Sequence, residues 1–245
     1  MYKINDSKVL INLLSKDKIG NINTIGRLKF QKEYNLFVDN LNNPQGYILQ
    51  NDEWNVIYSQ DSKTTDKLLD SLLKKPQNFA GILRKYYDLI EKKAEIEWNE
   101  FCYLYYVTPE SLKIKKPKHK VDSLTLNDAE IVDYYYTYRS EHPKSLDYLK
   151  NCIQQRPSSV VRDENGNPIS WALVREDGSL GVMYTKKEHR GKGLAISVSV
   201  DLIKKAFDLG HTPYVHIVTD NSPSIALSES IGFKKYGEVV WFGTK

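Results

Sequence analysis

A short glycine-rich turn holds the residues of this sequence that are best suited to chemistry. The turn reads Arg190-Gly191-Lys192-Gly193-Leu194-Ala195. Its two glycines let the backbone turn tightly, and they leave no Cβ to keep a ligand away. A helix that begins here would add unpaired backbone N–H groups and the positive end of its dipole. Together with the basic side chains, these groups favour binding of an anion such as a diphosphate.

Other glycine motifs fit this turn less well. A dinucleotide fingerprint needs GxGxxG, and its third glycine is absent here. A Walker A loop needs GxxxxGK followed by Ser or Thr, which is also absent. An ordinary strand-to-helix turn that uses glycine for its geometry alone stays open on the pattern alone.

The flanking residues predict the two elements that position the turn. Over residues 180–185 the side chains alternate with period two, which is typical of a strand buried on at least one face. From Ala195 to Leu209 apolar residues recur at helical spacing, and Gly210 supplies a stop. The stretch is therefore expected to form a strand, a glycine-rich turn and an amphipathic helix.

Similar patterns predict a C-terminal unit around this stretch, starting near Val121. Asn127 and the residues after it offer a helix cap, and ENGN and EDGS are strong hairpin turns. The expected helices are 129–138, 144–155 and 222–230, and the expected strands are 158–163, 168–175, 214–219 and 236–242.

The N-terminal residues predict a second unit, 1–112, with no glycine-rich turn. The expected elements are a helix over 1–18, a meander of strands at 35–40, 46–50 and 54–60, helices at 64–74 and 82–94, and a strand at 97–107. The basic run 113–120 is interpreted as a solvated linker between the units or as an anion-binding strip.

Bulk properties indicate a globular protein. The chain has 245 residues, a net charge of +4 and 40% hydrophobic residues. No apolar run approaches a membrane span, and the N-terminus is too polar for a signal peptide, so a cytoplasmic location is expected. The basic residues are scattered, which disfavours nucleic-acid binding. Cys102 and Cys152 are far apart in sequence, so we expect buried thiols and no metal site.

Two motifs resemble those of the GNAT superfamily of acyl-CoA-dependent N-acyltransferases. Arg190, Gly193 and Ala195 occupy the defining places of its (Q/R)-x-x-G-x-(G/A) pattern. The run from Asn221 to Phe233 resembles the family's N-x-x-A-x-x-L-Y-E-x-x-G-F motif in register. Within the superfamily, the tandem halves and the layout around Trp171 are most similar to glycine N-acyltransferase-like two-domain proteins.

This resemblance implies an α/β (α+β) protein with the GNAT fold, a mixed and mostly antiparallel sheet flanked by helices. Residues 121–245 would form the N-acyltransferase domain, and 1–112 a degenerate GNAT-like domain. Acetyl-CoA or another acyl-CoA is the implied co-substrate. The implied binding residues are Met183, Tyr184, Thr185, Arg190, Gly191, Lys192, Gly193, Leu194, Ala195, Asn221 and Ser224.

The resemblance leaves the acid and the base of the reaction open. Ser228 stands where the family has the tyrosine that protonates the leaving thiolate, so Ser228, Tyr184, His216 and Tyr236 are the candidate acids. The family's general-base glutamate corresponds to Ser179, which Glu176 and Asp177 precede. A water held near Glu176, Asp177 or His216 is the expected base. Trp171 is interpreted as core or as a wall of the acceptor cleft.

The leading hypothesis is transfer of an acyl group to a primary amine of a small molecule or amino acid. The expected partner is that small-molecule amine, with no nucleic acid and no membrane, and the chain could form a homodimer. The alternatives are a non-catalytic acyl-CoA-binding or sensing protein and, third, a protein-interaction scaffold. Acetyl-transfer assays separate the first two, and titration with CoA separates both from the third.

Overall fold

The computed structural model describes residues 1–51, 53–114 and 116–245, which form two compact units. Unit 1 comprises Met1–Tyr105, His216–Asn221 and Lys235–Lys245. Unit 2 comprises Tyr106–Val215 and Ser222–Lys234. Short segments from the C-terminal part of the chain therefore group with the N-terminal residues. The domain division at 1–112 and 121–245 stays a prediction.

Unit 2 is built on an antiparallel sheet of three strands in the order β7-β8-β9. These are β7 (Ser158–Arg162), β8 (Pro168–Val174) and β9 (Leu180–Thr185). The turns between them place Gly166 at φ 83° and Gly178 at φ 84°, a region that glycine reaches without steric cost. All three strands were predicted, and so were their Asn-Gly and Asp-Gly turns.

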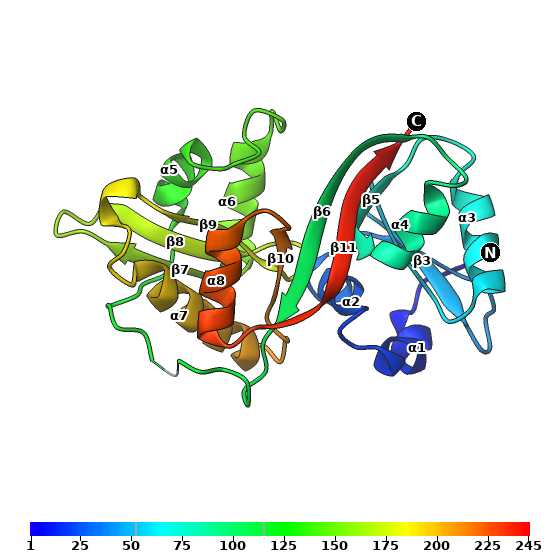
Figure 1. Cartoon of the computed structure of the whole chain (residues 1–245), viewed down its shortest axis with the longest axis horizontal. Coiled ribbons are helices and arrows are strands. Elements are labelled where there is room, and N and C mark those ends of the chain that lie inside the picture. Colours follow the sequence, from blue (N-terminus) through cyan, green and yellow to red (C-terminus); the bar gives the residue numbers. More distant parts are fainter. Residues whose placement is uncertain (52, 115) are drawn as a thin grey trace. The chain divides into compact units, whose positions relative to one another are not determined.

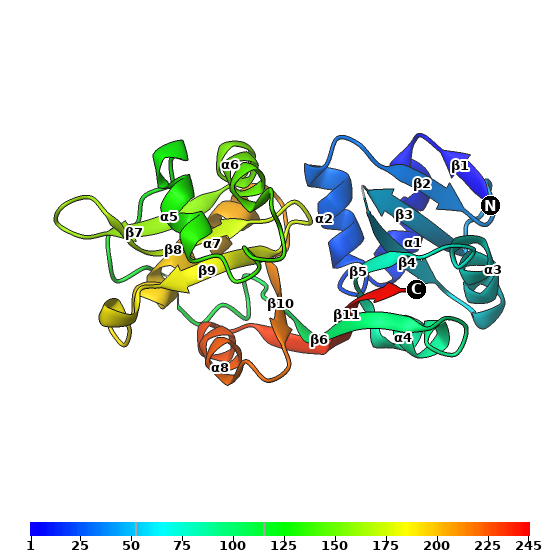
Figure 2. The same ribbon diagram turned by 90° about the horizontal axis from the view of Figure 1, so that it is seen from above.

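Helices cover both faces of this sheet (Figures 1 and 2). On one face lie α5 (Ala129–Tyr134) and α6 (Ser145–Gln155), whose apolar side chains share a core with the fully buried Trp171. On the other face lies α7 (Leu194–Asp208), which contacts all three strands. Trp171 is thus core, the first of its two interpretations. Next to α7 packs α8 (Ser222–Ile231).

α5 starts at Ala129 as predicted, but its cap and its C-terminal end differ from the prediction. The predicted helix 129–138 ends at Tyr134, and the predicted cap at Asn127 is wrong. A capping box lies earlier: the side chain of Thr125 accepts from the backbone of Asp128, and Asp128 Oδ2 accepts from the backbone N–H of Thr125 at 2.7 Å. This pair satisfies the first donors of a short 3-10 turn, from which α5 continues.

The eight-stranded sheet follows the order β1-β2-β3-β4-β5-β11-β6-β10 and forms the centre of unit 1 (Figure 1). The pairs β1–β2, β2–β3, β3–β4 and β5–β11 are antiparallel, and β4–β5 is parallel. Its strands are β1 (Tyr2–Ile4), β2 (Asn35–Val38), β3 (Gly46–Asn51), β4 (Trp54–Ser59), β5 (Asn78–Leu83), β6 (Ile96–Tyr106), β10 (Tyr214–Val218) and β11 (Lys234–Thr244). The predicted meander β2-β3-β4 and the strand at 97–107 are confirmed.

Successive side chains along each strand point to opposite faces of this sheet. Tyr47 and Leu49 of β3 join a core with α1 (Ile11–Lys16). Gly46 faces the other way, since a Cβ there would lie 2.7 Å from Thr64 in α3 (Ser62–Leu72). The helix predicted over 64–74 is thereby confirmed, and it covers one face of the meander.

Three N-terminal expectations are wrong in detail. Residues 1–18 do not form one helix, because Tyr2–Ile4 pairs with β2 as an edge strand. The helix α2 (Ile22–Phe30) was not predicted, because part of its buried face is polar: Asn23 donates to Ala80 O, and Arg27 donates to Asn23. The helix predicted over 82–94 begins only at Arg84 as α4 (Arg84–Ile90), because the residues before it form β5 between β4 and β11.

Candidate functional site

The glycine-rich turn has the geometry of an open anion cradle. Gly191 and Gly193 adopt φ 74° and 79°, so both need the left-handed region that suits glycine. A Cβ added at Gly191 would meet nothing within 4 Å, and one at Gly193 would reach only His119 Nε2, at 4.0 Å. Both glycines therefore face open space on the side where a side chain would project.

The helix end at this turn has no side-chain cap. Gly193 is the N-cap of α7, and the first helical hydrogen bond runs from Ser197 N to Gly193 O at 3.1 Å. The N–H groups of the first helical turn have no acceptor inside the helix. Arg190 and Lys192 are exposed beside them and donate to backbone carbonyls of Thr185 and Glu188. The start of α7 thus has backbone donors without a side-chain cap and two basic residues directly before it in the chain.

The basic run 113–120 is docked against the start of α7. The backbone N–H groups of Lys118 and His119 donate to Ser197 Oγ at 3.1 and 3.2 Å. The His119 ring Nε2 lies 2.9 Å from Lys192 O. Lys115, in the middle of the run, lies outside the described residues. These contacts show that the end of the run at Lys118 and His119 is docked on unit 2 and is not a free linker.

Strand β9 contains a β-bulge directly before the turn. Trp171 pairs with Tyr184 and Leu173 pairs with Gly181, so two residues of β9 oppose one of β8. Val182, inside the bulge, has φ 49°, a strained conformation for a β-branched residue. A bulge breaks the ladder and leaves backbone groups unpaired. The bulge lies beside the predicted N–H donors at 183–185.

The outer edge of β9 is also unpaired within the described residues. β9 is the last strand of its three-stranded sheet, and only β8 pairs with it. Edge strands present N–H and C=O groups that can bind an extended ligand. The bulge and the open edge of β9 are followed by a short 3-10 turn, Lys187–His189, and then by the glycine-rich turn. They form one site in unit 2.

Tyr184 lies in an aromatic stack behind this strand. Its ring stacks on Tyr135 with centroids 4.5 Å apart and lies 5.5 Å from Trp171. The Arg190 guanidinium lies over the same ring at 5.5 Å, a cation–π contact. These contacts hold the end of β9 against α5 and link Tyr184 to the turn.

A carboxylate–tyrosine pair, which the sequence did not reveal, lies before β9. Tyr148 on α6 donates to Glu176 Oε2 at 2.5 Å, and Arg175 Nε donates to Tyr148 Oη at 3.3 Å. Burial and the Glu176 charge raise the pKa of Tyr148 well above its usual range, although Arg175 opposes this. Tyr148 therefore keeps its proton, and its hydroxyl fixes the Glu176 carboxylate.

Glu176 differs from its neighbour Asp177, which was also expected near the base. Asp177 is fully buried, and its Oδ1 accepts from Ser179 N at 2.9 Å and Ser179 Oγ at 2.6 Å. That carboxylate shapes the turn between β8 and β9. Glu176 is only partly buried. Of these residues, Glu176 is the one that can meet solvent or a substrate.

Ser228 lies on α8 in the same unit, near its C-terminal end. Its carbonyl accepts from Gly232 N and Phe233 N at 3.1 and 3.0 Å, which closes the helix. Only 8% of its surface is exposed. Ser224 lies one turn earlier on α8, and Asn221, just before the helix, is grouped with unit 1.

His216 and Tyr236 belong to unit 1, whereas Tyr184, Ser228 and the glycine-rich turn belong to unit 2. His216 Nδ1 accepts from Trp241 Nε1 at 3.1 Å, and its ring fills the space where Gly81 lacks a side chain. Tyr236 donates to Asp17 Oδ2 at 2.6 Å, and burial and that carboxylate raise its pKa. Both side chains have packing partners within unit 1.

Residues 1–51, 53–114 and 116–245 contain neither a metal-binding cluster nor a membrane-spanning helix. This part of the chain holds no group of three or more His, Cys, Asp or Glu side chains placed to bind a metal ion. Its helices are each too short or too polar to cross a bilayer. Cys102 and Cys152 are buried and form no disulfide, as expected.

Sequence comparisons single out the part of the chain that carries this site. Residues 160–242 match the family model described as FR47-like protein. Bovine glycine N-acyltransferase is 25% identical, over 51% of this chain and 46% of that protein. A mouse glycine N-acyltransferase-like protein is 30% identical, over 33% of this chain and 27% of that protein. The matches thus span less than half of these relatives.

Solved structures share the fold of the whole chain at low identity. A Drosophila protein superposes with a TM-score of 0.84 at 17% identity, covering 100% of this chain and 98% of that one. A GCN5-related N-acetyltransferase from Kribbella flavida superposes with a TM-score of 0.60 at 14% identity, covering 93% of this chain and 94% of that one. A tandem GNAT protein from the clavulanic acid biosynthesis pathway superposes with a TM-score of 0.55 at 11% identity, covering 99% of this chain and 98% of that one.

Proposed function

We propose that the chain is a member of the GNAT superfamily and that it transfers an acyl group from acetyl-CoA or another acyl-CoA to a primary amine. The acceptor would be a small molecule or an amino acid. The observation that carries the proposal is the uncapped start of α7 behind Gly191 and Gly193, with open space in front of it. We also propose that the protein is cytoplasmic and that it forms a homodimer.

The residues present fit an acyl-CoA. The diphosphate of CoA would lie against the N–H groups that follow Gly193, with Arg190 and Lys192 beside it, because helix N-termini favour anions. A bound acyl-CoA supplies a thioester, whose carbonyl carbon is open to attack by an amine. The bulged strand, residues 183–185, would offer backbone N–H groups to the carbonyl oxygen as negative charge develops on it.

Glu176 is proposed to help deprotonate the acceptor amine, directly or through one water. Its carboxylate is held by Tyr148 and remains partly exposed. An amine must lose a proton to complete its attack, and a positioned carboxylate can accept that proton. Because the departing thiolate has a pKa near that of cysteine, about 8.5, solvent could protonate it. The proposal therefore needs no dedicated acid at Ser228.

The experiment that tests the proposal compares two glycines at opposite ends of α7. Gly193→Glu places a carboxylate in the cradle and should weaken acetyl-CoA binding at least about tenfold, since like charges repel and the helix dipole is neutralised. Gly210→Glu is the matched control: Gly210 also has a positive φ, 64°, and no heavy atom within 4 Å of an added Cβ. Both variants carry the same strain and the same charge.

Calorimetric titration with acetyl-CoA, followed by acetyl transfer to a panel of amines, gives the readout. Equal affinities in the two folded variants would contradict the cradle. Tight binding by the parent protein without transfer to any amine would favour the alternative, a non-catalytic acyl-CoA-binding protein.

A further inference from the structure

A buried arginine on α2 of unit 1 lacks a counter-charge in the part of the chain that the structure describes. Arg27 is 1% exposed. Its Nε donates to Asn23 Oδ1 at 2.8 Å, but its Nη2 is buried and neither Nη nitrogen donates to another described residue. None of the ion pairs among residues 1–51, 53–114 and 116–245 involves Arg27. The outer end of this guanidinium therefore needs a partner from elsewhere.

A buried guanidinium is costly unless an anion neutralises it. Arginine keeps its proton in proteins, so the charge cannot be removed by titration. A buried charge without its partner costs about 3–5 kcal/mol. A water molecule could accept a hydrogen bond from Nη2, but it would leave the charge itself unbalanced. An anion satisfies both requirements.

The guanidinium is held in one orientation. Asn23 Nδ2 donates to Ala80 O of β5 at 2.8 Å, so the amide is fixed and presents its Oδ1 to Arg27 Nε. Asn23 itself is 4% exposed. A donor group that is fixed before the ligand arrives loses little entropy on binding.

A second polar atom one helical turn away also lacks a partner. Gln31, the C-cap residue of α2, has a buried Oε1 that accepts from none of the described residues. Residues four positions apart on a helix lie on one face. Two buried polar groups without protein partners therefore follow one another along α2.

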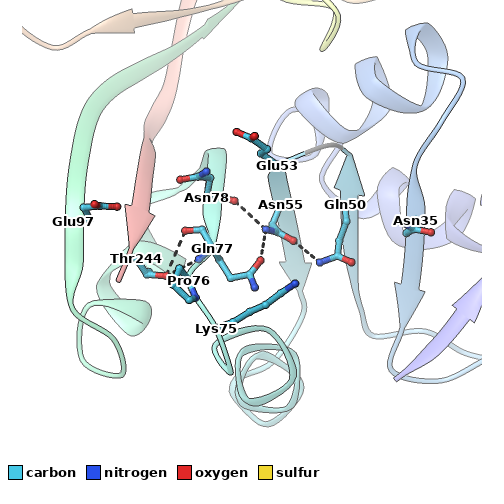
Figure 3. Close-up of a pocket in the computed structure, with 10 residues that line it drawn as sticks. All are labelled: Asn35, Gln50, Glu53, Asn55, Lys75, Pro76, Gln77, Asn78, Glu97 and Thr244. Carbon is cyan, nitrogen blue, oxygen red and sulfur yellow. Dashed lines mark hydrogen bonds between the residues drawn. The ribbon is translucent and has the colours of Figure 1, made fainter. Parts of the chain in front are cut away.

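On the other face of the same sheet, side-chain amides bond to one another. Leu28 of α2 packs on the core that contains Leu49, and Gln50, the next residue of β3, points to the opposite face. There Gln50 Nε2 donates to Asn55 Oδ1 at 2.8 Å, and Asn55 Nδ2 donates to Gln77 Oε1 at 2.9 Å (Figure 3). Neutral amides are thus paired on that face, whereas the charged group on α2 is left for a ligand.

We propose that Arg27 binds a small monocarboxylate. The two Nη nitrogens would donate side by side to its two oxygens, because a planar guanidinium and a planar carboxylate match in this way. One negative charge balances one guanidinium, whereas a phosphate dianion would leave a surplus buried charge. Arg27 lies in unit 1 and the glycine-rich turn lies in unit 2, so the inference does not depend on the proposed function.

Urea unfolding of the full chain tests this inference, because a ligand that binds the folded state alone stabilises it. The comparison is between about 20 mM sodium acetate and about 20 mM sodium chloride, which screen charges equally. Acetate should lower the unfolding equilibrium constant at least about fivefold relative to chloride, as a Kd of about 5 mM or less requires. Equal stability in the two salts would overturn the inference.

Two variants of α2 locate the binding. Arg27→Met should lose the acetate effect, and its fold should persist, since an apolar residue in place of a buried charge is often neutral for stability. Lys29→Met, at an exposed position of the same helix, is the matched control and should keep the effect. An undiminished acetate effect in folded Arg27→Met would overturn the inference.

Arg27→Lys tests the same point if Arg27→Met does not fold. Lysine keeps the positive charge but lacks the paired donors of the guanidinium. Its acetate effect should therefore be smaller than that of the parent protein. An acetate effect equal to that of the parent would contradict the paired hydrogen bonds proposed for Arg27.

Discussion

At the scale of single residues, the structure separates groups that support the fold from groups that can react. Ser179 donates a hydrogen bond to the Asp177 carboxylate in a buried turn. The Ser228 carbonyl accepts the hydrogen bonds that end α8. Glu176 differs, because Tyr148 holds its carboxylate while part of the residue stays exposed. Because of these environments, and not because of residue type, Glu176 is the residue that we propose for proton transfer.

Substitution at Glu176 and at Ser228 should therefore have unequal effects on turnover. Glu176→Gln should lower kcat by about 10²–10⁴-fold, the usual effect of losing a general base, whereas Ser228→Ala should lower it by less than about tenfold. Steady-state kinetics at saturating acetyl-CoA, with a calorimetric check of CoA affinity, measures both. A hundredfold loss in Ser228→Ala at unchanged CoA affinity would assign the proton donor to the serine instead.

At the scale of elements, one ion pair fixes the start of α5 to the sheet of unit 2. Arg162 on β7 donates to both carboxylate oxygens of Asp128, at 2.8 and 2.7 Å. Asp128 also completes the capping box with Thr125. Burial by itself would raise the pKa of Asp128, but the hydrogen bonds from Arg162 and Thr125 outweigh it and lower the pKa.

Asp128→Asn should therefore destabilise the protein in a pH-dependent way. A lowered folded-state pKa stabilises the protein above the unfolded value of about 3.9, and that contribution is lost as the pH falls through the folded value. Breaking a largely buried pair should cost about 3 kcal/mol at pH 7. Urea unfolding at pH 7 and near pH 3 measures this difference, which should shrink at the lower pH.

An exposed acid serves as the control for that measurement. Asp147→Asn, on the exposed surface of α6, should change the free energy of unfolding by less than about 0.5 kcal/mol. An Asp128→Asn deficit that stays constant between the two pH values would contradict the role given to the ion pair.

At the scale of the whole molecule, unit 1 is completed by the end of the chain. β11 lies between β5 and β6 in the order of the sheet. Phe242 on β11 is fully buried and stacks on Phe79 of β5 with ring centroids 4.6 Å apart. Tyr87 of α4 meets the same ring edge-on at 4.9 Å. The core of unit 1 thus depends on residues more than a hundred positions away from it in sequence.

Phe242→Ala should destabilise unit 1 by about 3–5 kcal/mol, because it leaves a cavity in this aromatic cluster. Hydrogen exchange at β5 should rise, and Leu209→Ala, at a half-exposed residue of unit 2, should leave that exchange unchanged.

A fragment of residues 1–112 lacks β11 and should therefore not unfold cooperatively. Cooperative unfolding of that fragment would instead support the domain boundary that the sequence predicts.

The sequence by itself determined the features that depend on local pattern. The hairpins β7-β8-β9, the glycine-rich turn and α7 follow from period-two and helical spacing and from glycines that end up at positive φ. The two quoted motifs then indicated the superfamily. These signals are local because strand alternation, capping and turn geometry involve residues close together in the chain.

Only the tertiary structure decided the features that depend on distant residues. Nothing local marks Val182 for a bulge, pairs Tyr148 with Glu176, or docks the basic run on Ser197. β5 was missed because its partners include β11, and α2 because part of its buried face is polar and Asn23 there bonds to a strand far away in sequence. In each case long-range pairing or burial outweighs local preference, and a period-based prediction does not include that energy.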